Sequence, residues 1–147
     1  MTKRTKAQEK VRDHLDRRGT HTVEITENLV RYWWRVLNVA VFRGKLNPPR
    51  EIVIKHFKGH YGYCVGYVDE KRVNLGISPD IATREMFMTV LVHEMVHQWE
   101  HETYNRMGHA KRFYAWQDRI YRNLGLDLRA ETDPEDFFTY GEEQIYE

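Results

Sequence analysis

Residues 86–99 read Met-Phe-Met-Thr-Val-Leu-Val-His-Glu-Met-Val-His-Gln-Trp, and this stretch decides the fold. Around the polar residues His93, Glu94 and His97 it is apolar on nearly every side, which is the pattern of a helix buried all round. Ionisable groups inside such a helix destabilise it by several kcal/mol each unless something compensates them. The stretch therefore predicts a central helix whose polar side chains each need a partner in the core.

The spacing of His93 and His97 predicts that the two imidazoles share a metal ion. Residues four apart in an α-helix lie about 40° from each other, so both rings can place a nitrogen on one ion. Glu94 follows the first histidine and lies beside that ion, where it would act as general base toward a water molecule. The alternative is that both histidines are hydrogen-bonded core residues and that the glutamate lies on the surface.

The size of the chain, 147 residues, is that of one domain. Cys64 is the only cysteine, which excludes an intrachain disulfide and a cysteine-rich zinc ribbon. No run approaches the roughly 18 apolar residues of a membrane span, and no apolar signal segment follows the N-terminus. We expect a cytoplasmic protein with no membrane partner, and a monomer.

The charge is distributed unevenly and divides the chain into three parts. Residues 1–22 hold seven Lys/Arg against three Asp/Glu, and we expect them to form a basic arm or helix. Residues 23–126 hold fifteen Lys/Arg against eleven Asp/Glu. The tail of residues 127–147 holds one basic residue against eight acidic ones. A basic body attracts polyanions, and an acidic tail can compete with them for the same surface. The alternative is that both ends are merely solvated.

The first firm helix is predicted from about Thr26 to Phe42, where apolar residues recur at helical spacing. Thr22 or Thr26 can cap its N-terminus, and Gly44 ends it. Trp33 lies within an Arg-Tyr-Trp-Trp-Arg cluster that suggests stacking on nucleic-acid bases. Its helical spacing favours a place in the core instead.

Three strands follow, at residues 51–57, 60–68 and 72–77, and the last two are predicted to pair as a hairpin. The central helix is expected to run from about Thr83 to residue 101 or 104, and a last helix from about His109 to Leu124. The elements predict an α+β domain with an N-terminal helix, a small three-stranded sheet and two closing helices.

A catalytic zinc site usually has three protein ligands, so one more side chain is needed. The third histidine of a metzincin would stand six residues after His97, where this chain has Thr103, and the last helix contains no glutamate for a gluzincin site. His101 lies about 12 Å along the helix from His93, which is too far to complete one tetrahedron. His109 remains, because the turn before it contains Gly108 and allows the chain to fold back.

The residues that carry this site resemble a known family. His93-Glu-Met-Val-His97, followed by Gly108-His109-Ala-Lys-Arg-Phe113, is similar to the SprT-like zinc metalloproteases, the family of bacterial SprT and eukaryotic Spartan. The resemblance extends upstream to Phe42-Arg-Gly-Lys-Leu46, Gly62-Tyr-Cys64 and Val73-Asn-Leu-Gly-Ile-Ser78 and covers residues 26–124. It implies a zincin-like minimal metalloprotease domain at residues 23–126, with one zinc ion on His93, His97 and His109 and with Glu94 as the catalytic base.

The resemblance also implies a function. Members of the family hydrolyse peptide bonds. Spartan degrades proteins that are crosslinked to DNA, and DNA stimulates this activity. We therefore expect a zinc metallopeptidase with a protein or peptide substrate and with single-stranded or double-stranded DNA as a partner. An acidic tail stands where a zinc ribbon often follows the family's catalytic domain. We therefore expect a minimal member without the ribbon, from a bacterium or from a virus that acts in an infected host cell.

The sequence leaves two features of the mechanism open. Tyr61, Tyr63 and Tyr114 are the candidate donors for the oxyanion, and the sequence does not choose among them. The glycine-rich second strand can be an edge that pairs with an extended substrate, or a strand in close contact with a helix. The rival function is a non-catalytic module in which zinc only joins two helices while the basic surface binds nucleic acid or a protein.

Overall fold

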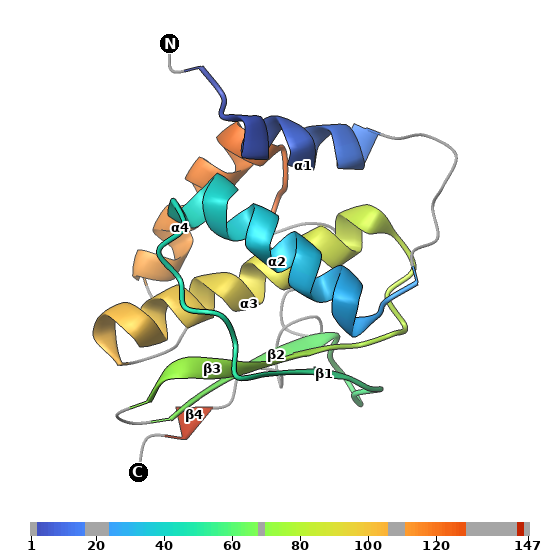
Figure 1. The fold of residues 1–147 in the computed structure, drawn as a ribbon, viewed down its shortest axis with the longest axis vertical. Helices are drawn as coiled ribbons and strands as arrows, with labels where there is room; N and C mark the ends of the chain where they lie inside the picture. The colour runs from blue at the N-terminus through green and yellow to red at the C-terminus, as the bar shows by residue number, and fades with distance from the viewer. Residues whose placement is uncertain (1–2, 17–23, 68–69, 106–110, 129–143, 146–147) are drawn as a thin grey trace.

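The part of the chain that the structure describes is α+β, with four helices on one side of a small sheet (Figure 1). The computed structural model describes residues 3–16, 24–67, 70–105, 111–128 and 144–145. The predicted α+β class, with its hairpin and central helix, is confirmed, and a short fourth strand that was not predicted joins the three expected ones. The elements are α1 (Lys6–Asp16), α2 (Glu27–Phe42), β1 (Glu51–Ile54), β2 (Gly62–Tyr67), β3 (Glu70–Ile77), α3 (Arg84–Tyr104), α4 (Lys111–Leu124) and β4 (Gln144–Ile145).

Threonine side chains fix where α2 and α3 begin. Thr26 accepts a hydrogen bond from the backbone N–H of Leu29 at 3.1 Å, and Thr83 accepts one from Met86 at 3.1 Å. Each hydroxyl satisfies an N–H group that has no partner within its own helix. Of the two predicted caps for the first firm helix, the structure thus uses Thr26.

The sheet has the order β1-β3-β2-β4. The hairpin of β2 and β3 is antiparallel, as predicted, whereas β1 runs parallel to β3 and β4 runs parallel to β2. The first strand is shorter than predicted, because Ile54 pairs with Ile77 at the end of β3 and no part of β3 is left to pair with residues 55–57. The acidic tail contributes β4 to the outer edge of β2.

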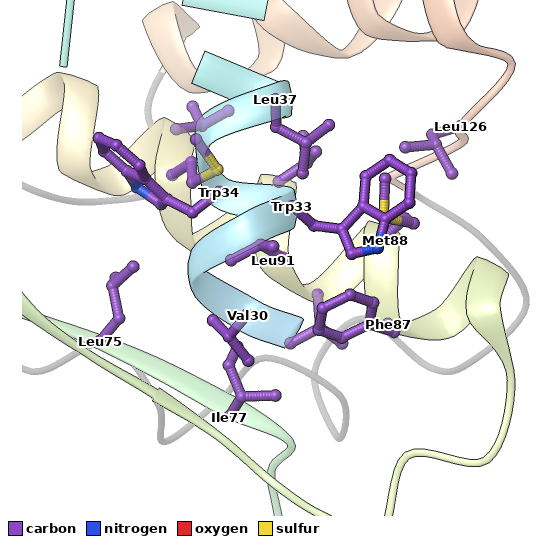
Figure 2. Close-up of a cluster of buried hydrophobic side chains, with 14 of the residues drawn as sticks. Val30, Trp33, Trp34, Leu37, Leu75, Ile77, Phe87, Met88, Leu91 and Leu126 are labelled. Atoms are coloured by element: carbon purple, nitrogen blue, oxygen red, sulfur yellow. The ribbon is translucent and has the colours of Figure 1, made fainter. Parts of the chain in front are cut away.

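The core forms where α2 and α3 pack against each other and against the sheet. Figure 2 shows side chains of α2 and α3 packed together above the sheet. Trp33 is 6% exposed, so the prediction that it belongs to the core is confirmed. Within the described residues no helix is both long and apolar enough to cross a membrane. The labelled core residues in Figure 2 are Val30, Trp33, Trp34, Leu37, Leu75, Ile77, Phe87, Met88, Leu91 and Leu126.

Helix α1 packs against α2 and α4. Its Val11 is fully buried, and the Arg12 guanidinium donates hydrogen bonds from Nε to the carbonyl of Asn123 at 3.0 Å and from Nη2 to that of Arg122 at 3.1 Å. These are carbonyls of the last turn of α4, which have no partner within their own helix. The basic N-terminal segment therefore contains a helix that is anchored to the domain.

Two glycines of β2 allow the sheet to approach α3 closely. A Cβ atom at Gly66 would lie 2.5 Å from Nδ1 of His101, and one at Gly62 would lie 2.8 Å from Cγ1 of Val90. Real Cβ contacts are not this short, so any larger residue would push the helix and the strand apart. Close contact with a helix, one of the two interpretations of this glycine-rich strand, is therefore observed.

A partly buried polar network joins α2, the segment after it and α3. The Trp34 indole donates to Oε1 of Gln98 at 3.0 Å, and Nε2 of Gln98 donates to the Asn47 carbonyl and to Oε2 of Glu102 at 2.8 Å. The backbone N–H of Asn47 donates to the other oxygen of Glu102 at 3.0 Å. Burial is the main influence on Glu102 and raises its pKa above the ordinary value of 4.5, although these hydrogen bonds act in the opposite direction.

We expect Glu102 to make the stability of the protein depend on pH. Its pKa is raised on folding, so its contribution is complete below the ordinary value of 4.5 and is lost as the pH rises through the folded value. Replacement by glutamine removes this titration. Urea unfolding across that pH range should show the natural chain losing stability relative to Glu102→Gln as the pH rises. A difference between the two proteins that does not change with pH would contradict this assignment.

Candidate functional site

His93 and His97 face each other near the middle of α3. The two Nε2 atoms lie 3.2 Å apart, and the ring planes are inclined at 71°. Both side chains are almost completely buried, at 1% and 0% exposure. The helical repeat that predicted their convergence thus places two imidazole nitrogens at one point inside the protein.

The carboxyl group of Glu94 lies between α3 and β2. The residue is 1% exposed, and a Cβ atom at Gly62 would lie 3.3 Å from its Oε2. A larger residue at position 62 would therefore press on the carboxylate. The predicted general base is held between the helix and the backbone of β2, and the alternative of a surface glutamate is wrong.

Glu100 is a second buried carboxylate beside the histidine pair. Its Oε1 lies 3.0 Å from Nδ1 of His97, and both side chains are completely buried. Glu100 was not among the predicted site residues. A signal was present, because a glutamate three residues after a histidine shares its helical face.

The histidine pair lies on the side of α3 that faces away from α2. Gln98 and Glu102 mark the side toward α2, through the network that includes Trp34. His93 precedes Glu102 by nine residues, which places the two side chains about 180° apart around the helix. A hollow lined by Lys45, Trp99 and Glu102, among others, is therefore not part of the site of His93 and His97.

His101 lies away from the pair, as its distance along the helix predicted. Its ring packs against Gly66, and its Nε2 is hydrogen-bonded to the carbonyl oxygen of Glu70 at the start of β3. This histidine fixes α3 to the hairpin.

The predicted oxyanion donors have different positions. Tyr63 pairs with Gly76, and its ring covers the space where a side chain of Gly76 would be, on the face of the sheet opposite α3. The structure therefore does not bring Tyr63 to the histidine pair. Tyr61 precedes Gly62, is half-buried and packs against the core. Tyr114 belongs to α4, but its side chain lies outside the described part of the structure.

His109, the predicted third ligand, lies outside the described residues. Within the described ranges no group of three His, Cys, Asp or Glu side chains is arranged to hold a metal ion. The geometry of the site is therefore described for two of the three predicted ligands and for the predicted base.

Comparison with known proteins identifies the family. Among curated proteins the chain has no match. The model of the SprT-like family matches residues 30–133, which is more than half of the chain and includes both β-hairpin strands and all of α3. The chain therefore belongs to the SprT-like family.

Proposed function

We propose that the protein is a zinc-dependent metalloendopeptidase that hydrolyses peptide bonds. Family membership suggests a function of the metalloprotease type. The observation that carries the proposal is the meeting of the His93 and His97 nitrogens inside the protein, with the Glu94 carboxylate on the next residue. A zinc site that only joins helices has no use for such a carboxylate, which favours an enzyme over a binding module.

The histidine pair fits a zinc ion in both chemistry and distance. Imidazole nitrogens are ordinary zinc ligands at about 2.0–2.1 Å, and two such nitrogens in a tetrahedral site are about 3.3–3.4 Å apart. The Nε2 atoms of His93 and His97 are 3.2 Å apart. This distance also suits a hydrogen bond between the two rings in the metal-free protein. We propose one zinc ion per chain, held by these two residues and by His109.

Zinc bound there supplies Lewis-acid chemistry, because it polarises a peptide carbonyl and acidifies water. Glu94 takes a proton from the attacking water and delivers it to the nitrogen of the leaving amine. Its position supports this role, because contact with β2 limits where the carboxylate can move. The same carboxylate thus acts first as a base and then as an acid.

The outer edge of β2 is where we propose that an extended substrate pairs. The tail pairs there in parallel, with Gln144 beside Gly66 and Ile145 beside Tyr67, so this edge accepts a further strand. A substrate strand that reached Gly62 would run beside Glu94, because those two residues are in close contact. Backbone hydrogen bonds would then bind substrates with little dependence on their sequence.

The function of Glu94 is tested by Glu94→Gln, which keeps the shape of the side chain but removes the base. We expect kcat for cleavage of an unfolded protein to fall by about 10²–10⁴-fold. Zinc content should stay equal to that of the natural chain, because Glu94 is not proposed as a ligand. Glu85→Gln, at an exposed position of the same helix, is the matched control and should cleave normally. Unchanged cleavage by Glu94→Gln would refute the proposed role.

The third ligand is tested by the zinc content of His109→Ala after purification and dialysis. We expect the natural chain to keep one zinc ion and His109→Ala to keep much less, since two ligands hold the ion poorly. His56→Ala, at an exposed histidine, is the control and should keep zinc as the natural chain does. Full zinc content in His109→Ala would exclude that residue as a ligand.

We further propose that the substrates include DNA-bound or DNA-crosslinked proteins. The support is the distribution of charge, since seven of the 22 acidic residues lie in residues 129–147, together with a single arginine. Without that segment the chain would be clearly basic and would attract the phosphates of single-stranded or double-stranded DNA. The acidic segment then weakens DNA binding by repulsion.

This DNA proposal is tested by measuring affinity for a single-stranded oligonucleotide at several salt concentrations. A deletion should begin at residue 129, because Leu126 and Leu128 are buried in the core. We expect the shortened chain to bind DNA more tightly than the full chain, with an affinity that falls as salt is added. Absence of salt-dependent binding in both proteins would remove DNA from the proposed function.

A further inference from the structure

We propose that Glu100 is a positioning residue for the metal site, which orients the His97 ring and determines which of its nitrogens carries the proton. This inference rests on the zinc site proposed above and adds a residue that is not itself a ligand. Its basis is the contact between Nδ1 of His97 and Oε1 of Glu100 at 3.0 Å.

The direction of this hydrogen bond follows from the chemistry of the two groups. A carboxylate oxygen accepts the hydrogen bond that an imidazole N–H donates, so we infer that the shared proton lies on Nδ1 of His97. In a neutral imidazole the other nitrogen then carries a lone pair. That nitrogen, Nε2, is the one that lies 3.2 Å from Nε2 of His93. Glu100 therefore selects the tautomer whose lone pair points to the place proposed for zinc.

The position of Glu100 on the helix makes this orientation rigid. His97 and Glu100 are three residues apart on α3, and both side chains are completely buried. Their separation is set by the helical repeat and does not depend on a loop. The hydrogen bond at Nδ1 thus fixes the orientation of the His97 ring in the metal-free protein.

A comparison with Glu102 separates this role from a purely structural one. Glu102 lies two residues further along α3, on the side facing α2, where the side chain of Gln98 and the backbone of Asn47 donate to it. Its hydrogen bonds join parts of the core. Glu100, in contrast, bonds to a predicted metal ligand. The completely buried Glu100 and the half-buried Glu102 therefore have different partners on one helix.

A carboxylate behind a metal-bound histidine raises the basicity of the ligand, and loss of such a partner typically lowers metal affinity by about 10–100-fold. We expect Glu100→Ala to weaken zinc binding within that range. Glu100→Gln keeps an oxygen that accepts from Nδ1 but removes the negative charge, so its affinity should fall between those of Glu100→Ala and the natural chain. Glu102→Gln is the matched control and should bind zinc as tightly as the natural chain.

The test has two readouts, and neither requires cleavage. The first is the zinc dissociation constant, measured by competition with a chromophoric chelator for each folded variant. The second is the tautomer of His97 in the metal-free protein, read from long-range ¹H–¹⁵N correlations of the imidazole. We expect the proton on Nδ1 in the natural chain and in Glu100→Gln, and a mixture of tautomers in Glu100→Ala. A merely structural role for Glu100 would not move the tautomer.

Each outcome decides the proposal. Zinc affinity and tautomer unchanged in Glu100→Ala would overturn it. If Glu100→Ala does not fold, the tautomer of the natural chain decides, because a proton on Nε2 of His97 in the metal-free protein would overturn the proposal. Failure of the proposed peptidase function is a separate result. It would appear as zinc binding without cleavage by the natural chain, and it would leave both readouts for Glu100 intact.

Discussion

The burial of the central part of α3, from Phe87 to His101, is the constraint on which the rest of the structure depends. A helix covered by α2 on one side and by the sheet on another cannot leave polar side chains to water, so each must meet a partner inside the protein. Gln98 and Glu102 meet the indole of Trp34 and the backbone of Asn47, and His101 meets the hairpin. The remaining buried ionisable residues of α3, which are His93, Glu94, His97 and Glu100, form the candidate site.

The local parts of this arrangement could be predicted from the sequence. Apolar residues around His93, Glu94 and His97 identified the buried helix, and the four-residue spacing placed the two rings together. Threonine caps and alternating strand residues identified α2 and the hairpin. All of these patterns operate within a few residues of the chain, where the helical and strand repeats fix the geometry.

Contacts between distant segments were not predictable in the same way. The parallel pairing of Ile52 with Leu75 depends on how the whole chain closes, because hydrophobic alternation in β1 does not specify its neighbour or its direction. The pairing of β4 with β2 joins segments more than 70 residues apart. Glu100 was missed for another reason: its helical spacing was visible, but only its burial against His97 distinguishes it from a solvated residue. The close approach at Gly62 and Gly66 was one of two open interpretations until the helix was placed.

The four polar residues of the site come from one continuous segment of eight residues, His93 to Glu100. Their relative positions are set by the backbone of a single helix, and the other elements of the fold exclude water from around them. Such a segment can be transferred to another helical protein as one unit. Grafted onto a buried helix of a designed bundle, it would keep the two imidazoles and their flanking carboxylates in register, and only a third histidine from a neighbouring helix would have to be added.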